Sequence, residues 1–157
     1  MLQYSKRKKG GAGVEKTVDL EKLLSEGNTV QIKPRGWSMY PMMRPGDEAV
    51  IAPVNEGKLK RGDVVLFRRE GGILVLHRIW KVSEKGLFLV GDNQVEVEGP
   101  VKREQIRGRL TAFIRKGKTI SARNPAYRVL ASLWLRLRPI RNVIKRPGAW
   151  MKRKFFK

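Results

Sequence analysis

The sequence predicts a mainly β fold with a short N-terminal helix and basic amphipathic helices at the C-terminal end. Two observations carry this prediction. Short segments of alternating apolar and polar residues, separated by glycine-containing turns, fill residues 28–121, and apolar residues at helical spacing lie only before and after them. The length of 157 residues with 41% apolar residues suits one domain that buries a real core.

The N-terminal part of the chain divides into two pieces. Residues 1–16 are rich in lysine and glycine and predict a flexible basic arm. A short helix is expected next, because Leu20, Leu23 and Leu24 fall at the i, i+3, i+4 spacing and Gly27 suits the helix end. The β domain, counted with this helix, is therefore expected to occupy residues 17–121.

Six short strands are expected in the middle of the chain. The candidates are residues 28–33, 48–54, 63–69, 73–82, 87–90 and 105–115. Hairpin turns are predicted at Gly71-Gly72, Lys85-Gly86 and Lys116-Gly117, because glycine readily adopts the positive φ of tight turns. Consecutive hairpins predict one compact domain of antiparallel strands.

Residues 122–157 predict a basic amphipathic helical tail. A helix over residues 125–138 places five apolar residues on one face, namely Ala126, Leu130, Leu133, Trp134 and Leu137. A second basic helix is expected around residues 140–146, followed by a basic aromatic end.

Two roles for this tail are open. In the first, the apolar stripe packs on the β domain and the arginines form a solvated face. In the second, the tail contacts an anionic membrane peripherally, with Trp134, Trp150, Phe155 and Phe156 at the headgroup level.

The net charge of +21 is distributed unevenly. Residues 1–16 carry a net charge of +4, residues 17–100 carry twelve basic and twelve acidic residues, and residues 101–157 carry a net charge of +17. A charge of this size favours a nucleic-acid or anionic-membrane partner. Because the middle of the chain is neutral, such a partner is expected to meet its ends.

Several chemistries are excluded by composition. The chain has no cysteine and one histidine, His77, so it forms no disulfide, uses no thiolate nucleophile and builds no Cys-based or multi-histidine metal centre. No cofactor is expected. Arginines interrupt every apolar stretch before a membrane span is reached, and no apolar run follows the basic N-terminus as it would in a secretory signal. The expected location is cytoplasmic, with or without peripheral membrane contact.

Three local patterns stand out in the neutral middle. They are GWSMYP at residues 36–41 with RPGD at 44–47, RGDVVLF at 61–67, and LVLHRI at 74–79 with GDN at 91–93. Each pattern alone is typical of a loop, a turn or a buried strand. In this order and at this spacing they resemble the superfamily of signal peptidases and LexA-like self-cleaving proteins, over residues 29 to about 114. The resemblance implies a LexA/signal-peptidase-like β fold and serine peptidase activity.

The resemblance also implies roles for individual residues. Ser38, which precedes Met39, matches the nucleophilic serine. His77 falls where bacterial signal peptidases and LexA-like proteins have a general-base lysine, and where signal peptidases of the archaeal and endoplasmic-reticulum type have histidine. The chain therefore resembles the Ser/His branch, without the membrane-spanning anchor of signal peptidases.

Acidic residues complete the implied site. Asp92 matches an aspartate that the Ser/His branch requires, and only Glu96 or Glu98 is available for a further family aspartate that follows shortly after it. The chemistry is consistent, since a serine hydroxyl needs a base, neutral imidazole serves as one, and a carboxylate orients the imidazole.

The groove and the oxyanion hole are expected beside the nucleophile. The backbone N–H of Ser38 is the natural oxyanion donor. Gly36 stands where signal peptidases usually have serine, as it does in LexA-like proteins, so the oxyanion hole relies on backbone donors. Trp37 and Met39 flank the nucleophile, and a strand edge near residues 33–37 could bind an extended peptide.

Three functions are compared on this basis. The leading hypothesis is a serine endopeptidase that cuts a leader, signal or precursor peptide, with Ser38 as nucleophile and His77 as general base. The second is a LexA-like self-processing regulator that cuts its own arm, for which Ala12-Gly13 offers a small-residue bond. The third is a nucleic-acid binder with a degenerate peptidase fold, supported only by the basic C-terminal part. The oligomeric state is left open.

Overall fold

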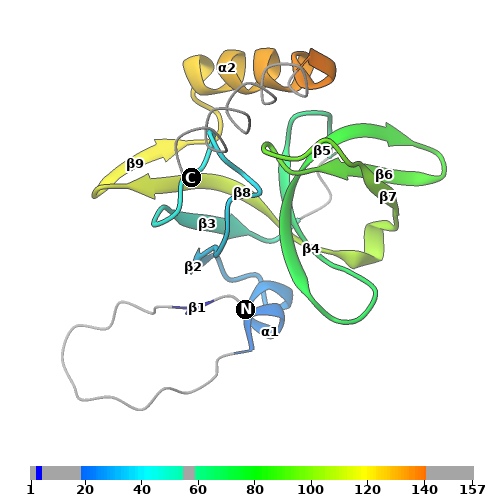
Figure 1. The fold of residues 1–157 in the computed structure, drawn as a ribbon. Coiled ribbons are helices and arrows are strands. Elements are labelled where there is room, and N and C mark those ends of the chain that lie inside the picture. The colour runs from blue at the N-terminus through cyan, green and yellow to red at the C-terminus, as the bar shows by residue number, and fades with distance from the viewer. Residues whose placement is uncertain (1–2, 5–18, 55–58, 141–157) are drawn as a thin grey trace, which may run out of the picture.

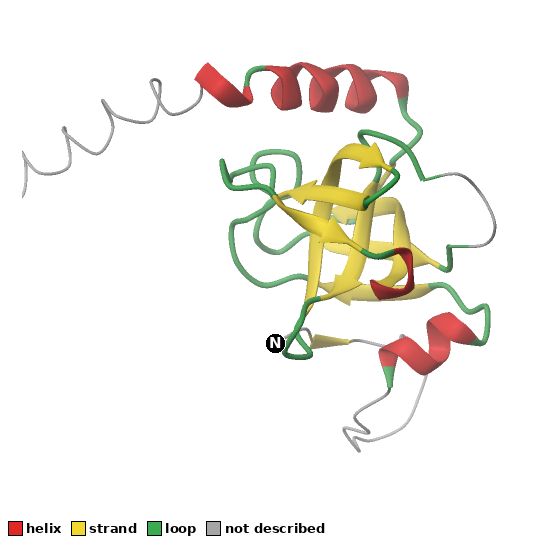
Figure 2. Cartoon of the chain, turned by 90° about the vertical axis from the view of Figure 1, so that its right-hand side faces the viewer, coloured by secondary structure: helices red, strands yellow, loops and turns green. Residues whose placement is uncertain are grey.

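The chain folds into a strongly coiled antiparallel sheet with a helix at each end of it (Figure 1). The computed structural model describes residues 3–4, 19–54 and 59–140. Within these ranges the strand order is β1-β2-β3-β8-β4-β5-β6-β7, and β9 pairs with β8. The mainly β fold class is confirmed, and the coiling of the strands is plain in the second view (Figure 2).

The elements follow the expected order. They are β1 (Gln3–Tyr4), α1 (Leu20–Ser25), β2 (Val30–Lys33), β3 (Glu48–Ala52), β4 (Val64–Arg68), β5 (Leu74–Ser83), β6 (Gly86–Val90), β7 (Glu98–Val101), η1 (Arg103–Gln105), β8 (Ile106–Arg115), β9 (Lys118–Ser121) and α2 (Pro125–Arg136). All six expected strands form, and the three glycine turns connect β4 to β5, β5 to β6 and β8 to β9. Strands β1, β7 and β9 are additions, and β1 lies in the arm that the sequence predicts to be flexible.

Two hydrophobic cores lie on opposite faces of the central strands. Residues Val64–Phe67 of β4 are all buried, which explains their unbroken apolar run. Alternate residues face different cores: Leu66 packs with Met39 in the first core, whereas Val65 and Phe67 pack with Ile79 in the second. The middle of the sheet is therefore covered on both sides.

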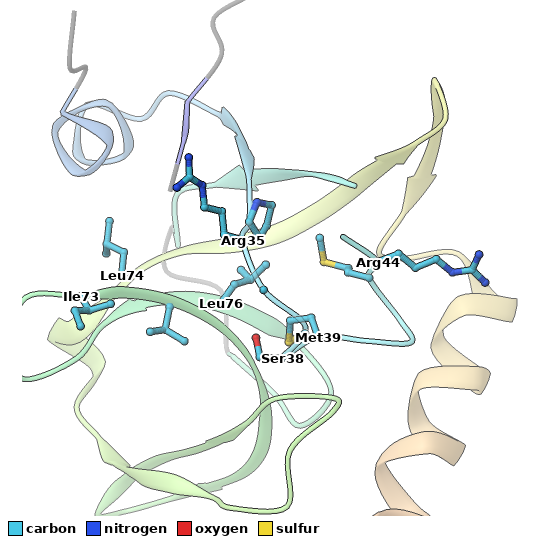
Figure 3. Close-up of a pocket in the computed structure, with 11 residues that line it drawn as sticks. Arg35, Ser38, Met39, Arg44, Ile73, Leu74 and Leu76 are labelled. Atoms are coloured by element: carbon cyan, nitrogen blue, oxygen red, sulfur yellow. The ribbon is translucent and has the colours of Figure 1, made fainter. Parts of the chain in front are cut away.

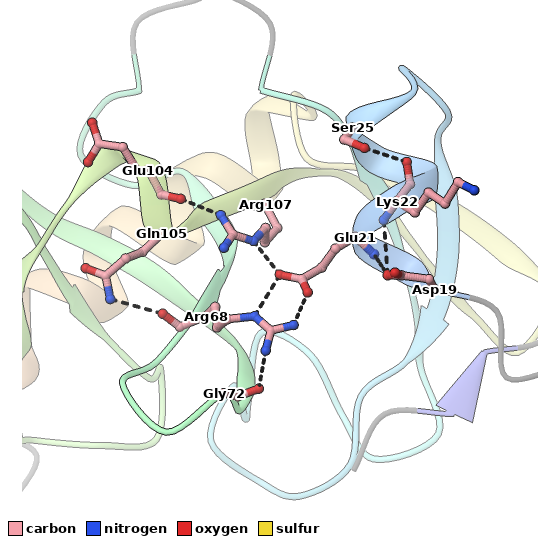
Figure 4. A network of polar contacts seen from close by, with 9 residues as sticks. All are labelled: Asp19, Glu21, Lys22, Ser25, Arg68, Gly72, Glu104, Gln105 and Arg107. Carbon is pink, nitrogen blue, oxygen red and sulfur yellow. Dashed lines mark hydrogen bonds and ion pairs between the residues drawn. The ribbon is translucent and has the colours of Figure 1, made fainter.

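Helix α1 is fixed to the first core and to a surface charge network. Its N-cap Asp19 accepts hydrogen bonds from the backbone N–H groups of Glu21 and Lys22, and Leu24 is buried. Glu21 pairs with Arg68 of β4 and Arg107 of β8 (Figure 4). The exposed side of α1 is thereby attached to two strands of the sheet.

Helix α2 lies across the end of the β body opposite α1 (Figure 1). Asn124 caps it by accepting from the N–H of Tyr127, and Pro125 occupies its first turn. The helix ends at Arg136, two residues before the expected boundary. The second helix expected around residues 140–146 lies almost wholly outside the described residues, as does most of the N-terminal arm. No helix in the described part of the chain is long and apolar enough to span a membrane.

Candidate active site

Ser38 lies in a groove of about 210 Å³ beside strand β5 (Figure 3). The groove is bounded on one side by Pro34, Arg35, Gly36, Ser38, Met39, Met43 and Arg44, and on the other by Ile73, Leu74, Val75 and Leu76. These last four residues directly precede His77 in the sequence. The fold thus brings the predicted nucleophile to the strand that carries the predicted base.

The loop that carries Ser38 is held at both ends of its turn. Before Ser38, Gly36 has a φ of +93°, a backbone conformation that residues with a side chain rarely adopt. After Ser38, Met39 is buried in the first core. Asp47, also buried, accepts from the N–H of Arg44 at 2.8 Å and pairs with Arg115 of β8 at 2.7 Å. The Gly-Asp at 46–47 therefore closes the loop rather than entering the chemistry.

The turn at residues 91–93 touches the backbone of Ser38. The N–H of Asn93 donates to the carbonyl oxygen of Ser38 at 2.7 Å. A Cβ on Gly91 would lie 2.7 Å from the same oxygen, so only glycine permits this approach. The Gly-Asp-Asn pattern is therefore explained in part as a support for the serine.

His77 is fully buried on the side of β5 that faces the second core. It lies opposite Val65 of β4, and its ring centre is 6.0 Å from that of Phe67. Its Nδ1 lies 2.9 Å from Oε1 of Glu98, although the N–H is not aligned well enough to form a hydrogen bond. Burial lowers the pKa of His77, and the Glu98 carboxylate opposes that effect without reversing it. The imidazole is therefore neutral at neutral pH.

Glu98, the first residue of β7, joins His77 to Arg69. The guanidinium of Arg69 binds both carboxylate oxygens of Glu98. Burial acts to raise the pKa of Glu98, but Arg69 and His77 outweigh it and the pKa is lowered. The carboxylate is thus kept ionised beside Nδ1, which favours the tautomer with a proton on Nδ1 and a free lone pair on Nε2.

Asp92 pairs with Arg78, the residue after His77. Nε and one terminal nitrogen of Arg78 each donate to a different carboxylate oxygen at 2.7 Å, and both side chains are buried. Burial acts against the charge of Arg78, but Asp92 outweighs it and the pKa of Arg78 is raised. The Asp92 charge also acts on the imidazole of His77, although its oxygens are held by Arg78.

Other elements close this buried pair. Arg78 donates to the carbonyl of Gly62 at 2.7 Å and to the hydroxyl of Tyr127 on α2 at 3.1 Å. Trp134, about two turns further along the same helix, donates its indole N–H to the carbonyl of Asp92 at 2.7 Å. The RGD pattern at residues 61–63 and helix α2 therefore both support the residues beside the groove.

The remaining expected residues are placed as follows. Trp37 is 62% exposed and packs on Tyr40, with ring centres 5.6 Å apart, and it is not among the residues that line the groove. Glu96 is exposed, whereas Glu98 contacts the imidazole. Sequence reasoning missed Arg69 and Tyr127, and no local pattern marked either one. Among the residues that the structure describes, no three acidic, cysteine or histidine side chains gather as metal ligands.

Comparison with known proteins finds one family whose sequence model matches this chain. The sequence model of the Peptidase S24-like family matches residues 7–111. This range includes helix α1, the groove, Asp92, Glu98 and most of β8. No curated protein sequence matches the chain.

Proposed function

This chain belongs to the Peptidase S24-like family, and from that premise we propose that it is a serine endopeptidase acting on an extended peptide. Ser38 is the nucleophile, His77 the general base and Glu98 the carboxylate that orients the imidazole. One observation carries the proposal: Arg69 binds Glu98, and Glu98 contacts the buried His77. His77 lies on β5, the strand that lines one side of the Ser38 groove.

The proposed reaction follows from the two nitrogens of His77. Because Nδ1 faces Glu98, Nε2 is the nitrogen available to take the Ser38 hydroxyl proton as Oγ attacks the peptide carbonyl. The imidazolium then donates that proton to the leaving amine, the acyl–enzyme forms, and water attacks it with His77 again as base. The ionised Glu98 stabilises the imidazolium at each stage.

The groove indicates how a substrate is held. Its floor is apolar where Leu74 and Leu76 line it, and its outer wall carries the exposed Arg35 and Arg44. An extended peptide with small or apolar side chains near the cut would fit the floor, and acidic flanking residues would fit the arginines. The Ser38 N–H is the proposed oxyanion donor, and the unhindered Gly36 leaves room beside it.

The test is cleavage of a peptide library, read as new termini by mass spectrometry. The wild type is expected to produce a defined set of cuts, and Ser38→Ala and His77→Ala are each expected to lose at least about 10³-fold in rate. Ser25→Ala is the matched control, because Ser25 lies on α1, where its hydroxyl donates to the carbonyl of Lys22. Cuts that persist in Ser38→Ala would refute the proposal.

Self-processing is a second candidate, favoured by one observation. Strand β1 pairs with β2 so that Gln3 lies opposite Lys33 and Tyr4 opposite Ile32. Because the pairing is antiparallel, Gln3 lies at the end of β2 that leads to Pro34 and Arg35 of the groove, and the chain after Tyr4 leaves in the opposite direction, so self-processing requires the following residues to return to Ser38. The bond between Ala12 and Gly13 lies outside the described residues. Loss of residues 1–12 that is seen by intact-mass measurement in the wild type, but not in Ser38→Ala, would support this candidate.

A further inference from the structure

Helix α2 has two faces of very different character. The inner face packs on the β body: Ala131 and Leu135 are buried, and Tyr127 and Trp134 hydrogen-bond Arg78 and Asp92. Just after the helix, Arg138 donates to the carbonyl of Val95 at 3.0 Å and stacks over the ring of Trp80. This face fixes how the helix is rotated on the body.

The outer face is apolar and exposed. Five large side chains on it are between 44% and 60% exposed, namely Val129, Leu130, Leu133, Leu137 and Ile140. At 100° per residue they lie within one stripe, on the side opposite the buried Ala131 and Leu135. Three of them come from the stripe that the sequence suggested as core, so packing on the β domain is not their role here. An exposed stripe of this kind marks an interaction surface.

The charges around this outer stripe identify its partner. Arg136 is exposed beside the stripe, and Arg128 is exposed further round the same helix. No acidic residue occurs anywhere from residue 105 to residue 157, and residues 122–157 carry eleven lysines and arginines. A second copy of this chain docking stripe to stripe would bring like charges together. A partner surface with an apolar interior and an anionic exterior would match both the apolar stripe and the positive charge around it.

We propose that the outer stripe of α2 lies in the surface of an anionic lipid bilayer, with the helix axis parallel to the membrane plane. The apolar side chains enter the boundary of the acyl chains, and the arginines meet the phosphate headgroups. Trp134 does not take part, because its indole N–H is engaged with Asp92 on the inner face. The inner face of α2 meanwhile contacts Arg78 and Asp92, so these two residues would lie about one helix diameter from the lipid.

Vesicle binding tests this proposal without any use of peptidase activity. The full chain is expected to bind vesicles of phosphatidylglycerol and phosphatidylcholine, and to bind phosphatidylcholine vesicles far more weakly. Leu130→Gln with Leu133→Gln is expected to weaken binding at least about tenfold, because each change removes apolar area from the interface. Val82→Gln is the matched control, since Val82 is 48% exposed on β5 against 50% for Leu133.

A labelling experiment keeps the test decisive if the double variant folds poorly. Because the chain contains no cysteine, Leu133→Cys and Val82→Cys each create a single site for an environment-sensitive dye. Anionic vesicles are expected to shift the emission of the dye at position 133 to the blue and to leave that at position 82 unchanged.

Three results would overturn the proposal. The first is vesicle binding that is equal in the double variant and in Val82→Gln. The second is self-association without lipid that the double variant abolishes, which would assign the stripe to a second copy. The third is binding to duplex DNA with no binding to anionic vesicles, which would assign the charge to nucleic acid.

Discussion

Two arginine–carboxylate pairs flank the candidate base, and they differ chiefly in burial. Arg78 and Asp92 are both fully buried and are closed over by α2, whereas Arg69 is 40% exposed and Glu98 26% exposed. His77 and Arg78 are neighbours on β5, so their side chains point to opposite faces of the sheet. Strand β5 therefore directs His77 toward the Arg69–Glu98 pair and contributes Arg78 to the pair with Asp92.

The difference in burial separates two tasks. A buried pair must stay complete, because removing one partner leaves an uncompensated charge in a medium that cannot solvate it. A half-exposed pair contributes little to stability, but its carboxylate can still act on a neighbouring imidazole. We therefore assign the Asp92 pair to holding the site together and the Glu98 pair to the state of the imidazole.

The largest expected effect breaks the buried pair. Asp92→Asn should lower the free energy of unfolding by about 3–5 kcal/mol, because Arg78 loses its counter-charge while it stays buried. Urea unfolding measures this loss. Glu21→Gln is the control, since its partners Arg68 and Arg107 lie on the surface, and it should cost at most about 1 kcal/mol. Equal losses in the two variants would refute the contrast.

Removal of the Glu98 charge should affect activity far more than stability. In Glu98→Gln the rate kcat should fall about 10²–10⁴-fold, because the imidazolium is no longer stabilised. The free energy of unfolding should change by about 1 kcal/mol or less. The measurement pairs kcat on the best library peptide with urea unfolding, and a loss of stability with unchanged kcat would reverse the assignment.

The pH dependence refines the same contrast. The folded-state pKa of His77 lies below its ordinary 6.5, so the base remains neutral, and kcat/KM should hold, to a pH below 6.5. Glu98 raises that pKa and Arg69 lowers it, so Glu98→Gln should move the acidic limb of the kcat/KM profile to still lower pH. A limb that moves upward would show that Glu98 is not the carboxylate that acts on the base.

The smallest expected effect concerns the closing helix. Trp134→Phe removes the indole N–H that binds the Asp92 carbonyl and should lower the free energy of unfolding by about 1 kcal/mol. Trp37→Phe is the matched control, because Trp37 is mostly exposed, and it should cost less than about 0.5 kcal/mol. Thermal unfolding of both variants measures the difference.

The sheet could be predicted where turns and strands carry local signals. The glycine-containing hairpin turns and the unbroken apolar run of β4 made it possible to predict the strands beside them. Strand β7 was missed because EGPV contains a glycine and a proline and lacks alternation, so its pairing with β6 depends on tertiary contacts. The existence of α2 was also readable from its spacing.

The candidate site could be predicted only up to the identity of its residues. The order of motifs drew attention to Ser38, His77 and Asp92, and it left Glu96 and Glu98 equivalent. Which of the two glutamates meets the imidazole depends on the register of β7, and which carboxylate meets Arg78 depends on the turn at residue 91. The rotation of α2 was equally hidden, because it is decided by two hydrogen bonds, which Tyr127 accepts from Arg78 and Trp134 donates to Asp92, and not by the apolar stripe.

The hydrogen bond from Asn93 to the carbonyl of Ser38 makes one amide proton a reporter on the nucleophile loop. For that proton to exchange with solvent, the loop must separate from the turn that carries Asp92. Because the same turn is bound to Arg78 and Trp134, opening requires their contacts to loosen as well. Hydrogen exchange at Asn93 should therefore be as slow as in the central strands, which would make the position of the serine a property of the cooperative fold and not of a flexible loop.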